Sequence, residues 1–504
     1  MQIKKRAIAS LAATAAGAMA VTTLAAPAMA GNPNNAEKMA KAVSVDAVWE
    51  HLEAFQAIAD EHGDRAAGTA GYEASGAYVE QQLQAAGYET ERQYFEFTYQ
   101  ETLAETLREV SPTARDIDHH MMSYSGNTPD EGLQEELVAP STATGCDASA
   151  WEGVDATGKI ALISRGACTF SAKSLAAAEA GALGAIVHNN AEGDLNGTLG
   201  GPNPDFLPTT GITQADGQAL LAEMAEGPVE VFLDLRSFSE VRETFNVLTE
   251  TSQGRDDNVV MMGAHLDGVQ GGPGVNDNGT GSAAILETAI QLADVNKLNN
   301  KVRFAWWGAE ELGLLGSEHY VYDLVDNNPE VLEEIATYVN FDMVGSPNHI
   351  IGVYDADEST YDAPVTVPAG SAETEDVLTD WFDSVGQPWV DTMFSGRSDY
   401  QAFIENGVPA SGLFTGADGV KTQEEVELFG GTEGIIYDPN YHTPEDSIDN
   451  VNRSALDVMS DAIAAAAITL AQDTSLVNGA RSAGKSGNPH PAGDLEAHTH
   501  EDAA

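Results

Sequence analysis

The chain has 504 residues, 42% of them hydrophobic and 20% charged, which is enough for two or three domains that each bury a core. Its 79 acidic residues face only 23 Lys and Arg, giving a formal net charge of −56. This charge repels phosphate, so it excludes nucleic-acid binding as the main role and disfavours anionic membranes. We expect a highly soluble protein.

The N-terminus is typical of a secretory signal peptide. Basic residues 4–6 precede an uncharged, Ala-rich stretch over residues 7–26, and the small residues 28–30 follow. This order predicts cleavage after Ala30 and export to the extracellular space or the periplasm. A retained membrane anchor is the alternative, but the stretch is only weakly apolar. We expect no later segment able to span a bilayer, and hence no stable membrane association.

The next segments predict two helices and a strand. Residues 31–43 are polar, and we expect them to be flexible. Apolar residues then recur at helical spacing from Val45 onward, and a second helix is predicted over 72–86. Alternating residues over 89–98 indicate a strand.

The character of the sequence changes between residues 104 and 245. Loops rich in Gly, Pro and Asn separate three short β-like runs and one Ala-rich helix, at 160–164, 185–188, 229–235 and 171–180. We interpret 104–245 as a small domain inserted into the first. The only cysteines, Cys146 and Cys168, fall inside it, and an isolated pair in an exported chain predicts a disulfide.

From Asn258 onward strands alternate with helices. We predict strands over 258–263, 302–307, 337–341 and 350–354, and helices over 282–293, 374–385 and 454–471. This alternation predicts an α/β fold with a mostly parallel or mixed central sheet flanked by helices. Residues 44–103 and 246–473 would form this discontinuous domain. The polar tail over 474–504 is expected to be disordered, and its match to a phosphate-loop pattern at 479–486 lacks the strand and helix that such a loop requires.

Polar side chains gather just past the ends of the predicted strands, where ligands bind in such sheets. They are His265, Asp267, Asp277, Glu310, Glu311, Asp342, Tyr441, His442 and Asp446. Carboxylates crowded at one sheet edge would repel each other without a cation, and a divalent metal resolves that conflict. Five of them are suitable ligands, and one bridging carboxylate lets five residues make three contacts to each of two zinc ions.

Several segments resemble the M28 family of co-catalytic zinc aminopeptidases. They are DRAAGTAGYEASGAYVEQQLQAAGYE (64–89), AHLDGVQGGPGVNDNGTG (264–281), WWGAEELGLLGSEHY (306–320), NFDMVG (340–345), SGRSDYQAF (395–403) and YHTPEDSIDN (441–450). The insert resembles a protease-associated (PA) domain through GKIALISRGACTF (158–170) and AGALGAIVHNN (180–190). Together the resemblance covers residues 45–472.

The resemblance implies a role for each ligand. His265 and Asp342 would hold one zinc ion, Glu311 and His442 the other, and Asp277 would bridge them. Glu310, adjacent to a ligand but not one itself, would be the general base for a water between the ions. Tyr441 would steady the tetrahedral oxyanion.

Further residues are implied around this centre. Asp267 would orient His265, and Asp446 would do so for His442. Arg397 matches a residue that contacts bound substrate in some members, and the aromatics Phe341, Phe394 and Phe414 are candidates to line the pocket for the N-terminal side chain.

The resemblance implies an enzyme that removes N-terminal residues, with a preference for Leu or other large apolar residues, from peptides and proteins. The signal peptide predicts that it is secreted, and we expect a monomer. A catalytically inactive PA-containing binding protein on the same scaffold is one alternative. A glutaminyl cyclase using a single zinc ion and a carboxypeptidase are others. Metal content distinguishes the binding protein and the single-zinc cyclase from the two-zinc enzyme. A carboxypeptidase should cleave a substrate with a blocked N-terminus, and an aminopeptidase should not.

Overall fold

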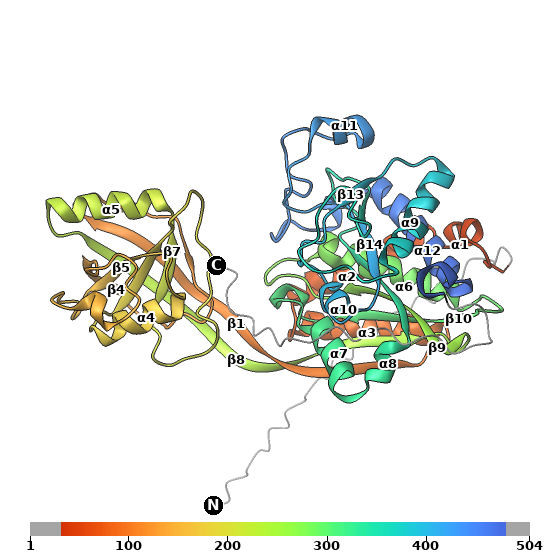
Figure 1. The fold of residues 1–504 in the computed structure, drawn as a ribbon, viewed down its shortest axis with the longest axis horizontal. Helices are drawn as coiled ribbons and strands as arrows, with labels where there is room; N and C mark the ends of the chain where they lie inside the picture. Colours follow the sequence, from red (N-terminus) through yellow and green to blue (C-terminus); the bar gives the residue numbers. More distant parts are fainter. Residues whose placement is uncertain (1–31, 480–504) are drawn as a thin grey trace, which may run out of the picture.

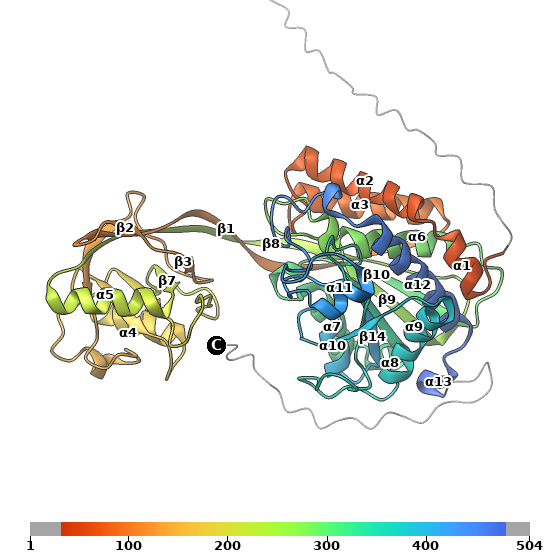
Figure 2. The same ribbon diagram turned by 90° about the horizontal axis from the view of Figure 1, so that it is seen from above.

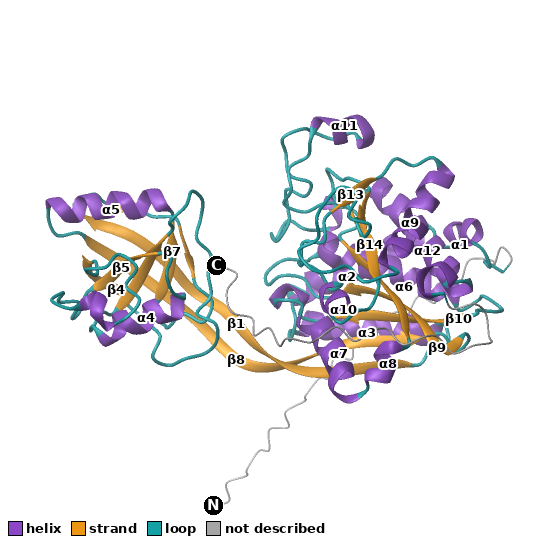
Figure 3. Cartoon of the chain, in the orientation of Figure 1, coloured by secondary structure: helices purple, strands orange, loops and turns teal. Residues whose placement is uncertain are grey.

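The computed structural model describes residues 32–479, which form a larger and a smaller body joined by a long two-stranded ribbon (Figures 1 and 2). The predicted signal peptide and residues 480–504 lie outside the described residues. Strands run through both bodies, and helices cover the sheet of the larger one (Figure 3). The predicted α/β fold with a mixed central sheet flanked by helices is confirmed.

The sheet of the larger body has the strand order β13-β12-β14-β11-β9-β10-β8. Neighbours from β14 to β10 run parallel, as do β12 and β13, whereas β8 and β12 pair antiparallel to β10 and β14. The strands are β8 (Glu230–Glu250), β9 (Arg255–His265), β10 (Asn300–Trp307), β11 (Ile335–Asp342), β12 (Gly352–Tyr354), β13 (Val390–Thr392) and β14 (Ala410–Phe414).

Side-chain alternation along the central strands supplies a core on each face of this sheet. On β10, for example, Phe304 and Trp306 belong to one hydrophobic cluster and Trp307 to another. The first cluster is covered by α1 (Ala36–Ala42), α2 (Val45–His62), α3 (Ala70–Ala85), α6 (Thr280–Leu292), α9 (Ser371–Val385) and α12 (Arg453–Gln472). The second is covered by α7 (Leu315–Asn327), α8 (Pro329–Glu333) and α10 (Gln401–Glu405).

Two segments expected to lack structure are helical. Residues 36–42, inside the expected flexible segment, form α1, because Asn35 caps the helix and Met39 is buried against the core. The expected disordered tail begins instead with α13 (Ser475–Asn478), next to the buried Thr474. Both expectations were wrong because a few apolar or capping residues anchor these short polar segments.

One helix in the described part of the chain, α12, is long and apolar enough to cross a membrane by length and composition. This corrects the expectation that no later segment would be. However, 72% of its most apolar window is buried, and its neighbours include α6 and α9 in the first hydrophobic cluster. The apolarity of α12 is therefore accounted for by its position in the core.

The smaller body continues the sheet from β8 in the order β4-β5-β6-β7-β3, with α4 and α5 packed on it. Its elements are β3 (His119–Met121), β4 (Leu133–Val138), η1 (Ala148–Trp151), β5 (Ile160–Ser164), α4 (Phe170–Glu179), β6 (Gly184–His188), β7 (Thr209–Ile212) and α5 (Gln214–Glu226). The ribbon consists of β1 (Thr90–Ser111), with the short β2 (Arg115–Asp116), and β8 paired antiparallel to β1.

A disulfide joins Cys146 to Cys168, as predicted, with Cα atoms 5.9 Å apart. Beneath it the fully buried Lys173 donates hydrogen bonds to the carbonyl oxygens of Thr144 and Gly166, at 2.7 and 2.8 Å. The disulfide closes a loop across 22 residues in sequence. Loop closure of that length stabilises a fold by about 3 kcal/mol through the entropy of the unfolded chain.

Replacing both cysteines by Ser is therefore expected to lower the free energy of unfolding of the smaller body by about 3 kcal/mol. Hydrogen exchange of the β5 and β6 amides in urea measures this locally. The β9 and β10 amides of the larger body serve as the internal control. Unchanged exchange in β5 and β6 would show that the disulfide does not stabilise this body.

Candidate metal centre

Three of the five predicted ligands lie at the carboxyl ends of three neighbouring parallel strands. His265 ends β9, Asp342 ends β11, and Glu311 lies in η3 (Glu310–Leu312) directly after β10. Asp277 lies in η2 (Val275–Gly279), which leads into α6. His442 comes from the loop before η4 (Ile448–Asn450), far along the sequence. All five predicted ligands are brought together by the fold.

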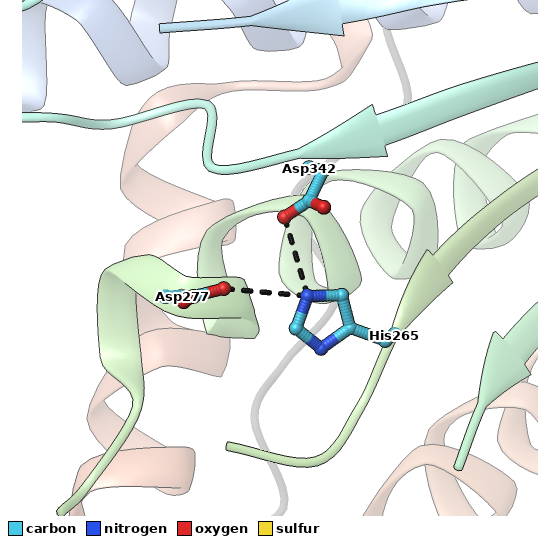
Figure 4. A group of neighbouring side chains, drawn as sticks. All are labelled: His265, Asp277 and Asp342. Atoms are coloured by element: carbon cyan, nitrogen blue, oxygen red, sulfur yellow. Dashed lines mark hydrogen bonds and ion pairs between the residues drawn. The ribbon is translucent and has the colours of Figure 1, made fainter. Parts of the chain in front are cut away.

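The first group of ligands is His265, Asp277 and Asp342, all buried (Figure 4). Nε2 of His265 lies 3.2 Å from Oδ1 of Asp342 and 3.3 Å from Oδ1 of Asp277. The other ring nitrogen, Nδ1, lies 3.0 Å from the carbonyl oxygen of Asp267. Since that carbonyl can only accept, Nδ1 carries the proton and Nε2 is free to bind a cation.

The second group is Asp277, Glu311 and His442. Nε2 of His442 lies 2.9 Å from Oε2 of Glu311 and 3.2 Å from Oδ2 of Asp277. Asp277 thus directs one carboxylate oxygen to each histidine, and it is the one residue shared by both groups. This is the arrangement that a carboxylate bridging two metal ions requires.

The donor set fits divalent cations. Oε1 of Glu311 is buried without a hydrogen-bond partner, so it is available as a ligand. Burial, together with the nearby charge of Asp277, raises the pKa of Glu311 to about 8. Although burial alone would lower it, hydrogen bonds to Asp277 and Glu311 raise the pKa of His442 to about 10. The raised pKa of His442 reflects the carboxylates around it, whose charge zinc ions with imidazole and carboxylate ligands would neutralise.

Glu310 lies beside both groups without belonging to either. Its Oε2 lies 3.8 Å from Nε2 of His265, and its side chain is 9% exposed. Burial, with the nearby carboxylates Asp342 and Asp399, raises the pKa of Glu310 well above its usual value. A buried carboxyl with a raised pKa that is not a ligand is suited to accept and return a proton.

Tyr441 stacks on the ring of His442, with ring centroids 3.8 Å apart. Its hydroxyl oxygen accepts a hydrogen bond from Arg397 at 3.3 Å, which leaves its hydrogen free to donate. Burial and the charges of Asp277 and Glu311 raise the pKa of Tyr441, so the hydroxyl stays protonated. Arg397 also pairs with Asp418 at 3.2 Å and is 57% exposed. The structure therefore places Arg397 against Tyr441.

Of the two residues expected to orient the histidines, Asp267 contacts His265, whereas Asp446 contacts other groups. Asp267 lies against His265, with its carbonyl oxygen 3.0 Å and its carboxylate Oδ1 3.8 Å from Nδ1, and its carboxylate also accepts hydrogen bonds from the backbone amides of Glu310 and Glu311, at 3.2 and 3.4 Å. Asp446, expected beside His442, instead accepts from the amides of Asn276 and Asp277, at 3.0 Å each. Both carboxylates fix the loops that carry the ligands, a role that side-chain types alone do not reveal.

Two residues of the site were missed by the sequence analysis. Arg65, fully buried, donates to the carbonyl oxygens of Leu266, Pro273 and Gly274, which lie in the loop between His265 and Asp277. Ser398 donates to Oδ2 of Asp342 at 2.5 Å. The only signal was their presence in the segments 64–89 and 395–403 that carry the family resemblance.

Two of the three aromatic residues proposed to line a pocket are packed inside the fold. Phe341 and Phe394 are 0% and 1% exposed, and Phe394 packs against Tyr354 and Tyr400. Phe414, which stacks on Tyr354, is only partly buried. Phe341 and Phe394 are therefore core residues, and of the three only Phe414 remains a candidate to line the pocket.

The chain is similar to known proteins over most of its length. The sequence profile of peptidase family M28 matches residues 246–467, and that of the PA domain matches residues 133–220. Leucine aminopeptidase 2 of Trichophyton tonsurans is 44% identical over 82% of this chain and 81% of its own length.

Two solved structures are also similar over most of the chain. An aminopeptidase from Aneurinibacillus sp. strain AM-1 has a TM-score of 0.67 at 26% identity, covering 87% of this chain and 96% of its own. A zinc aminopeptidase from Bacillus subtilis has a TM-score of 0.58 at 28% identity, covering 88% of this chain and 96% of its own.

Proposed function

The chain belongs to peptidase family M28 and is a zinc-dependent aminopeptidase, and we propose that it removes single N-terminal residues from peptides at two zinc ions held by the two ligand groups. The observation that carries this proposal is the position of Asp277, with one oxygen near His265 and the other near His442. Zinc ions bound there would lower the pKa of a water molecule and polarise the scissile carbonyl group.

The residues of this chain then supply the proton transfers and the orientation. Glu310 accepts a proton from the attacking water on its carboxylate and delivers it to the nitrogen of the leaving amine. The hydroxyl of Tyr441 donates a hydrogen bond to the oxyanion that develops on the carbonyl oxygen. Arg397, which donates to the oxygen of Tyr441, holds that hydroxyl in place.

The field of the site favours a positively charged substrate terminus. Three carboxylates that belong to neither ligand group, Asp267, Glu310 and Asp446, are also buried at the sheet edge, so the site would stay negative after zinc neutralises its ligands. A free α-ammonium group is attracted there, and an acetylated N-terminus is not. Because relatives of this chain are named leucine aminopeptidases, we propose that it prefers Leu and other large apolar N-terminal residues. We further propose that it is secreted after cleavage near Ala30 and acts as a monomer.

Hydrolysis of leucine p-nitroanilide, with N-acetyl-leucine p-nitroanilide as the control, tests this function. We expect release from the free amine and none from the blocked one. Release of C-terminal residues from blocked peptides would instead indicate a carboxypeptidase. Cyclisation of N-terminal glutamine without peptide hydrolysis would indicate a glutaminyl cyclase. Absence of metal and of turnover would indicate a binding protein.

Replacing Tyr441 by Phe removes the hydroxyl and keeps the ring that stacks on His442. Loss of a single oxyanion donor lowers kcat by about 10²-fold or more. We expect this loss in kcat with little change in KM and in bound zinc. The Tyr437→Phe variant is the matched control, since Tyr437 donates to the surface residue Glu425. An unchanged kcat in Tyr441→Phe would remove Tyr441 from the chemistry.

A further inference from the structure

A small cavity lies directly beside the second ligand group. Its volume is about 180 Å³, and Glu311 forms part of its wall. The lining residues come from three loops: Ala66 and Ala67 before α3, residues 267–270 after β9, and Glu311 and Leu312 after β10. No step of the proposed reaction uses this cavity.

The walls of the cavity are mostly apolar. Ala66, Ala67, Val269 and Leu312 provide aliphatic carbon, and the side chain of Leu312 is 40% exposed. The one buried carboxylate in the wall besides Glu311, that of Asp267, is occupied by the backbone amides of Glu310 and Glu311. The cavity therefore offers an aliphatic surface, and the carboxylate of Asp267 in its wall is already hydrogen-bonded.

The wall of the cavity that Ala67 forms is tightly packed. Ala67 packs with Phe95, Phe97 and Tyr99 of β1 and with Ala309, in a buried cluster at the base of the ribbon. At the rim, the side chain of Gln270 donates to the carbonyl oxygen of Gln100 on the same ribbon. The cavity thus lies between the larger body and the end of the ribbon that joins it.

The position of the cavity along the sheet edge decides which part of a peptide reaches it. The strand order β14-β11-β9-β10-β8 places Asp342 on one side of the centre and Glu311 on the other, toward the ribbon. On the Asp342 side, Tyr354, Phe394 and Tyr400 are buried and pack on one another, and we take this side as the end where the N-terminal residue lies. The peptide beyond the scissile bond must therefore continue on the Glu311 side, where Leu312, Val269 and Gln270 are at least partly exposed.

We propose that this cavity binds the side chain of the second residue of the substrate, the residue that becomes the new N-terminus, and that it favours aliphatic side chains there. This proposal rests on the proposed aminopeptidase function. At about 30 Å³ per molecule the cavity holds several waters, and an aliphatic side chain that displaces them from apolar walls gains affinity.

The test compares four substrates of the zinc-loaded, full chain: leucinamide, leucyl-glycinamide, leucyl-leucinamide and leucyl-asparaginamide. Leucinamide has no second side chain, and Asn is nearly isosteric with Leu but polar. We expect kcat/KM for leucyl-leucinamide to exceed that for both other dipeptides by about tenfold, the discrimination typical of an apolar pocket.

Two variants place a charge in the cavity, Leu312→Asp and Val269→Asp. Each should bring the ratio of leucyl-leucinamide to leucyl-glycinamide close to one, while the hydrolysis of leucinamide reports any general loss of catalysis. Leu428→Asp is the matched control, because Leu428 in α11 (Gln423–Phe429) is also an exposed leucine, at 48%, and does not line the cavity. It should keep the wild-type ratio.

Two results would overturn the proposal. One is a wild-type ratio near one. The other is a preference for leucyl-leucinamide over leucyl-glycinamide that stays at the wild-type value in the Asp variants. If only one of the two variants folds, that variant alone is sufficient for the comparison. Failure of the proposed function is distinct, because the wild-type enzyme would then leave leucinamide itself intact.

Discussion

Replacing Glu310 by Gln is expected to lower kcat by about 10³-fold, within the range that a general acid–base group contributes. The amide keeps the size of the side chain but has no carboxylate to take a proton from water. Zinc content should stay at the wild-type value, because Glu310 belongs to neither ligand group. Steady-state hydrolysis of leucine p-nitroanilide, with metal analysis of the same sample, measures both quantities.

The comparison variant is Glu445→Gln, which makes the same chemical change at an exposed position close to His442 in sequence. Its kcat should match the wild-type value. Loss of zinc from Glu310→Gln would contradict the assignment, since it would make Glu310 a ligand. Retention of full activity would show that another group carries the proton.

Replacing Asp277 by Ala should have the largest effect on metal binding. Asp277 is the one residue shared by the two groups, so its loss removes a ligand from both ions at once. If the ions are then lost, the remaining carboxylates, Glu311 and Asp342, are buried without cations. Even supporting residues of metal sites contribute about 10–100-fold to metal affinity, and a shared ligand should exceed this range. Zinc titration against a competing chelator measures the affinity directly, without reference to activity.

The His442→Ala variant provides the contrast. It removes a ligand from the second group alone, so one tightly held zinc ion should remain with His265, Asp277 and Asp342. If Asp277→Ala also kept one ion at wild-type affinity, Asp277 would not be a bridging ligand. The pair of variants thus separates a shared site from two independent ones.

The sequence predicted β9, β10 and β11 of the α/β domain because burial on both faces makes these strands continuous apolar runs, but it did not predict α7, β13 or β14. It predicted much less of the ribbon. We expected the strand at 89–98 to end there, whereas β1 continues to Ser111. Residues 100–104 are polar or exposed on both faces, so the alternation that marks a half-buried strand is missing. The ribbon also runs through the predicted insert limits at 104 and 245.

For the site, the predicted strands and the types of residues just past their ends were enough to group all five ligands. The supporting contacts were beyond sequence reasoning for a physical reason. Asp267 and Asp446 accept from backbone amides, and Arg65 donates to backbone carbonyls, so their partners have no side-chain signature. Such contacts depend on loop conformation, which no spacing rule specifies.

The most direct test of a bridged two-zinc centre is the zinc content of the purified, full-length protein, measured by elemental analysis before and after dialysis against a chelator. We predict about two zinc ions per chain. The chelator should remove the zinc and the aminopeptidase activity together, and adding zinc back should restore both. A single zinc ion at full activity, or full activity with no zinc, would contradict it.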